Sequence, residues 1–462
     1  MEDSEYNLQD LAQKAIEHAE KIKAGYVDIR IEDYSTSTIF RENKKFEDIS
    51  FGNGFGLGVK VIHKGKLGFY STTKADPIFA VEQALKLAKV NPSREKIKLK
   101  KSKTVKSKID DTGKNQINHD IDSHAQFLKD VEKTAQISPV LKSIQVILGN
   151  GVKNYIFANT EDTEILQKVG RTNLYVILVA KEKGELERCV FRLGAKDYTV
   201  FRNYEEKLKE KAKLVIDLLK AKKPLAGKFN VVLDPESTGV FAHEALGHAA
   251  EADLVLSNQS LLKGKSGKKI ASSCVSISDD PTIPEDKWGS YKYDDEGVLG
   301  RKTNIISKGI LKSFLHSRET AAKMNTGLTG NARAQNYMYV PIVRMSNTSF
   351  EAGDFSFNEL IKQVKNGYYL VGFKGGQVGP LEGTFSFASD HCYRIQNGKI
   401  KELLKGCTFS GKILDTLKNV TAVQKGKRKF TIGFCGKGGQ KVPVSDGGTH
   451  ISIKDLHIGG EE

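Results

Sequence analysis

The sequence has little of what marks a secreted or membrane-embedded protein. Its five cysteines include no CxxC pair, and their odd number suits a reducing compartment better than a disulfide framework. No run of about 18 apolar residues is present to span a bilayer. The first residues, Met1–Glu5, are acidic where a signal peptide would be basic. We therefore expect a cytoplasmic protein that is neither exported nor inserted into a membrane.

The length and net charge of the chain limit how it can be organised. At 462 residues the chain exceeds what one hydrophobic core usually serves, which predicts two domains. The net charge is +16, and much of the excess lies in the block Arg94–Lys108, which has no interleaved aromatic residues for stacking on bases. We interpret this block as solvated surface. A basic nucleic-acid-binding protein remains an alternative reading.

The hydrophobic pattern changes several times along the first half. Residues 6–24 have the three-to-four spacing of an amphipathic helix, and residues 26–70 alternate as an antiparallel meander does. Further helices are predicted at residues 77–89 and near 123–136, and further strands at 142–150 and 172–181. The first half is therefore expected to be α+β.

A short stretch rich in helix breakers, residues 223–227, separates a helix ending near Lys222 from an apolar strand at 229–233. We predict an amino-terminal α+β domain over residues 1–223 and a β-rich catalytic domain over residues 224–462. The predicted class is thus α+β, with an amino-terminal meander and flanking helices. Glycine pairs and single glycines in the second domain predict turns at Gly375–Gly376, Gly436, Gly438–Gly439 and Gly447–Gly448.

A candidate metal motif follows the apolar strand. Asp234 and Pro235 predict the start of a helix, because aspartate caps a helix and proline suits its first position. That helix carries His243, Glu244 and His248, and two imidazoles beside a carboxylate are what a hydrolytic zinc site uses.

The spacing of the two histidines does not suit a regular helix. Residues five apart differ by about 140° around an α-helix, whereas the usual four-residue spacing gives about 40°. We therefore predict either a π-bulge or an end of the regular helix near Gly247.

A catalytic zinc site normally takes three protein ligands and leaves one position open for water. By spacing alone Glu251 is the preferred third ligand, with Asp253 close behind it. The distant candidates are Cys435, His391 and His450.

Several stretches together resemble the TldD/PmbA family, and specifically its metal-carrying TldD branch. The segment Asp234–Asp253 is similar to the metal signature, and Tyr26–Tyr70 is similar to the amino-terminal meander of the family. Further blocks occur in family order at Gly330–Arg333, Pro341–Asp354, Gly375–Val378, Ile395–Ile400 and Phe434–Val442.

The resemblance implies a Zn²⁺-dependent peptidase. It implies that His243, His248 and Cys435 hold the zinc and that Glu244 is the general base. Glu251 then becomes a partner of the ligands or a residue on the substrate side. The pair His391-Cys392 departs from the family pattern, and we interpret it as core or surface filling.

The glycine-rich stretch 373–377 lacks the features of a phosphate-binding loop. Glycines let two backbones approach closely, so we predict that Gly375, Gly376 and Gln377 bind an extended peptide through main-chain hydrogen bonds. Such binding would give a broad sequence preference.

The resemblance also implies short or unfolded peptides as substrates, cleaved in a chamber formed by two subunits. The second subunit would be another copy of the chain or a PmbA-type paralogue. A non-catalytic partner subunit is a further alternative, but the presence of all four motif residues speaks against it.

Overall fold

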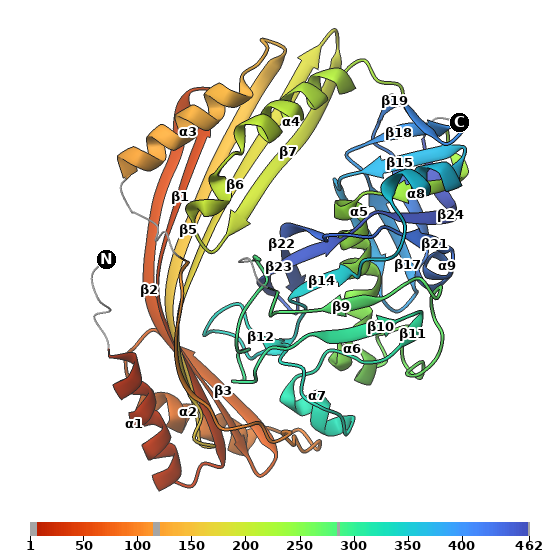
Figure 1. Ribbon diagram of the computed structural model, residues 1–462. Helices are drawn as coiled ribbons and strands as arrows, with labels where there is room; N and C mark the ends of the chain where they lie inside the picture. The colour runs from red at the N-terminus through yellow and green to blue at the C-terminus, as the bar shows by residue number, and fades with distance from the viewer. Residues whose placement is uncertain (1–6, 114–120, 284–286, 461–462) are drawn as a thin grey trace.

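The computed structural model describes residues 7–113, 121–283 and 287–460, and its amino-terminal half is built on one seven-stranded sheet (Figure 1). All neighbouring strands are antiparallel except the last pair in the main order, which is parallel. The order is β3 (Lys66–Thr72), β2 (Lys45–His63), β1 (Tyr26–Glu42), β5 (Leu141–Asn159), β6 (Glu164–Glu182) and β4 (Lys106–Asp111), with β7 (Glu185–Ala195) also on β6.

Four helices pack on this sheet in two pairs at its opposite ends (Figure 1). Helices α1 (Leu8–Lys21) and α2 (Pro77–Val90) share a core with the first three strands. Helices α3 (Ile121–Ala135) and α4 (Glu205–Leu218) share another core with β5, β6 and β7. The long strands curve round the carboxy-terminal half of the molecule.

The predicted helices and meander of this half are confirmed, although Met1 to Tyr6 lie outside the described residues. The predicted strands at 142–150 and 172–181 are parts of the longer strands β5 and β6. Strand β5 continues through Gly149 and Gly151 because β1 and β6 pair with it on both sides.

The basic block Arg94–Lys108 is irregular up to Val105 and then enters β4. Most of its lysines are exposed, while Ile97 and Leu99 are half-buried. This placement agrees with the solvated surface that the sequence predicts, because the charges face water and the apolar side chains face the protein.

The carboxy-terminal half contains a nine-stranded, a six-stranded and a two-stranded sheet. The nine strands are β16 (Gly375–Gly379), β17 (Thr384–Ala388), β20 (Thr408–Lys412), β24 (Ile451–Gly459), β8 (Gly227–Leu233), β15 (Gly367–Val371), β18 (His391–Gln396) and β19 (Lys399–Lys405) in order, with β21 (Val420–Val423) on β24. The six are β11 (Ile310–Leu311), β10 (Thr303–Ser307), β9 (Ile277–Asp279), β14 (Asn347–Phe350), β23 (Gln440–Gly448) and β22 (Lys429–Lys437), and β12 (Ala332–Arg333) pairs with β13 (Ile342–Val343).

One hydrophobic core joins the two large sheets of this half. It also takes in Phe241, Ala242, Ala245 and Leu246, which belong to the helical segment that follows β8. The remaining helices of this half are α5 (Pro235–Val240), α6 (Ala252–Leu256), α7 (Arg318–Lys323), α8 (Phe357–Val364) and α9 (Ile413–Lys418). The segment with the candidate metal motif is therefore held rigidly from both sides.

The α+β class is confirmed, with a β-rich second half that carries the motif helix. Helix α4 ends at Leu218 and β8 begins at Gly227, on either side of the predicted boundary at 223/224. The division into domains at that boundary remains a prediction. No helix in the described ranges combines the length and the apolar character needed to cross a bilayer.

The predicted glycine turns are mostly wrong. Gly438 and Gly439 do form the tip of the β22–β23 hairpin, with φ values of 58° and 72°. The other glycines belong to strands, with Gly375 the first residue of β16, Gly436 within β22, and Gly448 the last residue of β23. Close packing requires glycine at positions 376 and 447, where a Cβ would collide with the rings of Phe387 and Phe430, whereas a Cβ on Gly375 or Gly436 would meet no atom of the described residues within 4 Å.

Candidate metal centre

The motif helix begins where the sequence predicts. Asp234 is the N-cap of α5, and its side chain accepts a hydrogen bond of 2.8 Å from the backbone N–H of Ser237. Pro235 occupies the first helical position, where its missing N–H costs no hydrogen bond. Strand β8 and this cap therefore fix the direction in which the motif leaves the sheet.

The predicted break in helical geometry is confirmed. The helix changes from α to π over Phe241–Gly247 and then to a single 3₁₀ turn over His248–Ala250. The backbone N–H of His248 donates to the carbonyl of His243, which is a five-residue hydrogen bond. The wider turn brings the two imidazoles to one side of the helix, with ring centroids 5.1 Å apart.

Gly247 is required by close packing and not by its backbone angles. Its φ of −56° is open to any residue, but a Cβ at this position would lie 2.0 Å from the sulfur of Met345. The Met345 side chain is fully buried. The π segment can therefore approach this core residue only with glycine at position 247.

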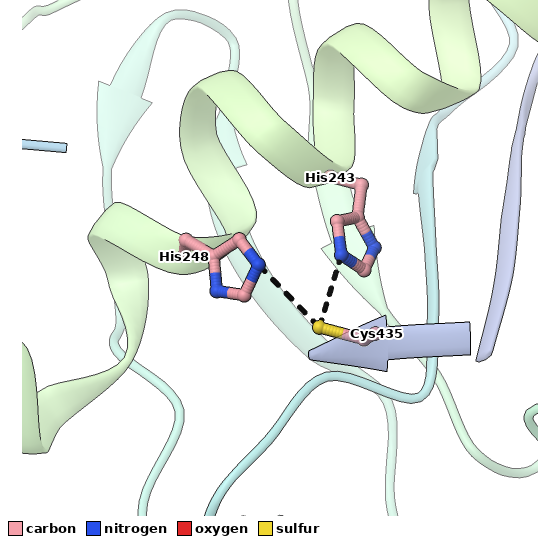
Figure 2. Close-up of side chains that lie close together, drawn as sticks. All are labelled: His243, His248 and Cys435. Carbon is pink, nitrogen blue, oxygen red and sulfur yellow. Dashed lines mark hydrogen bonds between the residues drawn. The ribbon is translucent and has the colours of Figure 1, made fainter. Parts of the chain in front are cut away.

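Cys435 completes a triangle with the two histidines (Figure 2). It lies on β22, and its Sγ is 3.3 Å from Nε2 of His243 and 3.4 Å from Nε2 of His248. All three potential ligand atoms lie within 4.8 Å of one another. His243 and Cys435 are buried, and the side chain of His248 is 12% exposed.

The donor set fits a zinc ion. Zinc binds imidazole nitrogen at about 2.0–2.1 Å and thiolate sulfur at about 2.3 Å, so a tetrahedral site separates N and S by about 3.6 Å. The observed separations between Sγ and the two Nε2 atoms are close to this value. Two imidazoles and one thiolate also leave the fourth position of a tetrahedron open.

A carboxylate lies against the other nitrogen of each histidine. Nδ1 of His243 is 2.7 Å from Oδ1 of Asp446, and Nδ1 of His248 is 2.9 Å from Oε2 of Glu251. Histidines that bind a metal almost always present their second nitrogen to such a partner, which orients the ring and fixes its tautomer. This pairing leaves both Nε2 atoms directed at the sulfur of Cys435.

The charges of the triangle reinforce one another. Burial by itself raises the pKa of the Cys435 thiol, but the two histidines outweigh it and lower that pKa to about 5. Burial lowers the pKa of His248, but Glu251 and Cys435 outweigh it and raise that pKa to about 10. The surroundings therefore favour the thiolate, which is the form of cysteine that binds metals.

Glu244 is the member of the motif that reaches solvent. Its side chain is 34% exposed, and its Oε2 lies 4.0 Å from Nε2 of His248. It follows His243 directly in the chain but is absent from the triangle of potential ligands. A carboxylate next to the potential ligands and open to water can accept a proton from a water molecule held there.

The structure distinguishes the candidates for a third ligand by their distance from the two histidines. Among the described residues, Cys435 joins the two histidines, whereas Glu251 contacts His248 on its far side. The preference for Glu251 from spacing alone is not what the geometry supports. His391 lies on β18 against Tyr393, and His450 hydrogen-bonds Gln424 and Tyr369, so both are parts of other packing groups.

The predicted peptide-binding residues lie on an edge strand. Gly375, Gly376 and Gln377 belong to β16, which pairs with β17 on one side and is the first strand of its sheet. Gly376 and Gln377 are exposed, and Val378 of the same strand packs against the core that contains the motif helix. The outer edge of β16 thus has no strand partner within the described part of the chain.

Sequence reasoning missed three residues that support the triangle. Asp446 on β23 contacts His243, Lys437 on β22 contacts Glu251, and the guanidinium of Arg344 donates to the carbonyl of Cys435. None belongs to a local motif with the histidines. The available sequence signals were that Arg344 and Lys437 lie in the family-like blocks Pro341–Asp354 and Phe434–Val442, and that Lys437 follows Cys435 by two residues.

Two family profiles match the chain. The profile described as the PmbA/TldA metallopeptidase C-terminal domain covers residues 226–460, and the one described as domain 1 of the same metallopeptidases covers residues 27–88. Among solved structures, the TldE of Thermococcus kodakarensis has a TM-score of 0.77 at 18% identity, covering 98% of this chain and all of that one. A Thermotoga maritima protein described as a candidate modulator of a DNA gyrase has a TM-score of 0.82 at 22% identity, with 98% and 100% coverage.

Relatives with higher identity carry metalloprotease names. A metalloprotease of Methanocaldococcus jannaschii is 42% identical, covering 92% of this chain and 94% of the relative. A zinc metalloprotease TldD homologue of Saccharolobus solfataricus is 34% identical, with 97% and 99% coverage. The profiles and these full-length relatives agree with the resemblance seen in the sequence. The chain therefore belongs to the PmbA/TldD family of metallopeptidases.

Proposed function

We propose that this chain is a zinc-dependent peptidase that hydrolyses peptide bonds in short or unfolded polypeptides. The proposal is carried by the convergence of His243, His248 and Cys435, with Glu244 beside them and open to solvent. These three side chains are the proposed zinc ligands. The Saccharolobus relative, which is named a zinc metalloprotease, supports the choice of metal.

The proposed chemistry divides between the ion and the chain. Bound zinc would act as a Lewis acid that acidifies a water molecule and polarises the scissile carbonyl. Glu244 accepts the proton of that water and then donates it to the leaving amine. Glu251 and Asp446 hold the imidazoles of His248 and His243 in the orientation that directs both Nε2 atoms to the ion.

The substrate is proposed to bind as an added strand on β16. Residues Gly375, Gly376 and Gln377 offer main-chain donors and acceptors on an edge that is open among the described residues. Strand addition needs an extended peptide and uses few side chains, so it selects unfolded chains and gives a broad sequence preference. A folded protein holds most of its backbone N–H and C=O groups in its own hydrogen bonds, so it offers far less extended chain for such pairing.

We further propose that the peptidase works as a dimer, either of two copies or with a PmbA-type paralogue. The likeness to a TldE structure supports a shared fold between such partners. Light scattering after size-exclusion chromatography, with and without the paralogue, decides between a homodimer and a heterodimer.

A cytoplasmic location remains a prediction from the sequence.

The test is Glu244→Gln, which keeps the shape of the side chain but cannot accept a proton. Zinc content should survive, while cleavage of unstructured peptides should fall by about two to four orders of magnitude. Glu206→Gln, an exposed change on α4, serves as the matched control. Equal cleavage by the Glu244 variant and the parent would remove Glu244 as the base.

Two further outcomes separate the alternatives. A parent chain that binds zinc but cleaves nothing, alone or with its paralogue, would support a non-catalytic partner subunit. A chain that binds no zinc but binds DNA with a steep salt dependence would support the alternative of a nucleic-acid-binding protein.

A further inference from the structure

Lys437 forms ion pairs with Glu251 and Asp253, and Glu251 in turn contacts His248 of the candidate metal centre. It lies on β22 two residues after Cys435, so both side chains leave the same face of the strand. Its Nζ is 2.8 Å from Oδ1 of Asp253 and 3.1 Å from Oε2 of Glu251. It also donates a hydrogen bond of 2.8 Å to the carbonyl of Val343. The ammonium group thus makes two hydrogen bonds, to Asp253 and Val343, and a further ion pair with Glu251.

The contact with Glu251 continues to a proposed zinc ligand. The same Oε2 atom of Glu251 that meets Lys437 lies 2.9 Å from Nδ1 of His248. The Glu251 side chain is fully buried, and its Oε1 has no hydrogen-bond partner among the described residues. A buried carboxylate is costly unless opposite charges compensate it. Lys437 supplies one such charge from the strand that also carries Cys435.

The β22–β23 hairpin therefore meets the motif helix at three points. Cys435 meets both histidines, Asp446 meets His243, and Lys437 meets Glu251 just after the end of the 3₁₀ turn. The first two points lie at the triangle, whereas the third lies beyond it and ties the strand to the start of α6. Three separated contacts fix both the distance and the rotation of the strand relative to the helix.

We propose that Lys437 is a positioning residue for metal binding. It holds β22 against the segment Glu251–Asp253, and it holds Glu251 in the place where that carboxylate orients His248. Lys437 itself is absent from the triangle of potential ligands and acts through Glu251 and through the strand. This inference rests on the proposed function, because it concerns the zinc that His243, His248 and Cys435 would bind.

The test measures zinc affinity and not turnover. Lys437→Met keeps the aliphatic stem and removes the charge and the donors. Its zinc dissociation constant, obtained by competition with a chelator on the purified full chain, should rise by about ten- to hundredfold, the usual effect of losing an outer partner of a ligand. Lys441→Met, an exposed change on the neighbouring strand β23, should leave the constant unchanged. Lys437→Arg, which keeps the charge, should restore most of the affinity.

A double variant tests the route through Glu251. If Lys437 acts through that carboxylate, Lys437→Met combined with Glu251→Gln should weaken zinc binding by less than the product of the two separate effects. Thermal unfolding of the zinc-free forms shows whether each variant folds. Should Lys437→Met fail to fold, Lys437→Gln, which keeps a hydrogen-bond donor, is measured in its place.

The outcomes separate this inference from the proposed function. Zinc binding by the parent together with equal affinity in Lys437→Met would overturn the role of Lys437 and leave the peptidase proposal intact. An equal loss of affinity in the Lys441 control would also overturn it, because the effect would then be general to the hairpin. Absence of zinc binding in the parent would overturn both.

Discussion

The carbonyl oxygen of His243 accepts a hydrogen bond from the backbone N–H of His248, five positions along the chain. In a regular α-helix this carbonyl would receive the N–H of Gly247, and the two imidazoles would point about 140° apart. The longer hydrogen bond widens the turn by one residue. A histidine spacing that does not suit an α-helix thereby suits one metal ion.

Gly247→Ala should disturb this turn. The added methyl group meets the sulfur of Met345, which lies in the core, so we expect a loss of about 1–3 kcal/mol in stability and weaker zinc binding. The double variant Gly247→Ala, Met345→Ala should bind zinc better than the single variant, because the clash is removed. Thermal unfolding and chelator competition measure both effects. No difference between the two variants would contradict the steric explanation.

Cys435→Ser should strip zinc from the protein. A serine hydroxyl is a poor zinc ligand, and the two histidines alone would hold the ion weakly. The parent should hold about one zinc per chain by elemental analysis. Cys274→Ser, at a half-buried thiol outside the triangle, is the control and should keep the metal. Unchanged zinc in the Cys435 variant would transfer the third ligand to another residue, with Glu251 first in line.

Asp446→Asn should weaken zinc binding by about ten- to hundredfold while the chain still folds. The substitution keeps the size of the side chain but removes the charge that faces Nδ1 of His243 at 2.7 Å. Asp48→Asn, at an exposed position on β2, should have no effect on the zinc dissociation constant. An affinity equal to that of the parent would show that the contact does not support the ligand.

Peptide binding along β16 should depend on the peptide backbone. In an added strand, alternate N–H groups face the neighbouring strand and the others face away. N-methylation of one alternate set of a substrate peptide should therefore raise KM strongly, while methylation of the other set should have little effect. Steady-state kinetics with the two methylated peptides and the parent peptide measure the difference. Equal KM values for all three would exclude strand addition.

Lys60 should stabilise the contact between the two halves of the chain. It is buried, and its Nζ lies 3.0 Å from Asp28 and 2.9 Å from Glu296. Lys60→Met leaves two buried carboxylates without their cation and should cost about 3–5 kcal/mol, measured as an earlier urea transition. Lys60→Arg should cost less, because it keeps the charge.

The ion pairs of Lys60 with Asp28 and Glu296 also make the stability of the protein depend on pH. Burial lowers the pKa of Lys60, but Asp28 and Glu296 outweigh it, and the net pKa is raised. The contribution of Lys60 to the free energy of unfolding is therefore complete below its pKa in the unfolded chain, about 10.4. It is lost as the pH rises through the higher pKa of the folded state. The stability difference between the parent and Lys60→Met should shrink as the pH rises above about 10.4. A difference that stays constant over this range would contradict the assignment.

The sequence by itself determined the local features of the candidate metal centre. Asp234 and Pro235 indicated the start of the helix, and the histidine spacing required a departure from α geometry, which the π turn supplies. These predictions succeed because a cap and a helical turn depend on residues within a few positions of one another. The amino-terminal meander was predictable for the same reason, since alternation is a local pattern.

The family resemblance implied Cys435, but residue patterns alone did not, and only the tertiary structure decided which distant side chains meet the histidines. Spacing favoured Glu251, but the chain bends after Ala250, and the carboxylate of Glu251 reaches the far nitrogen of His248. Cys435 lies 187 residues from His248 and arrives through the pairing of β22 with β23 and of β23 with β14. A shift of one residue in that pairing would turn the thiol to the opposite face of the sheet. Strand register is set by contacts between segments far apart in the chain, so no local pattern could have specified Cys435, Lys437 or Asp446.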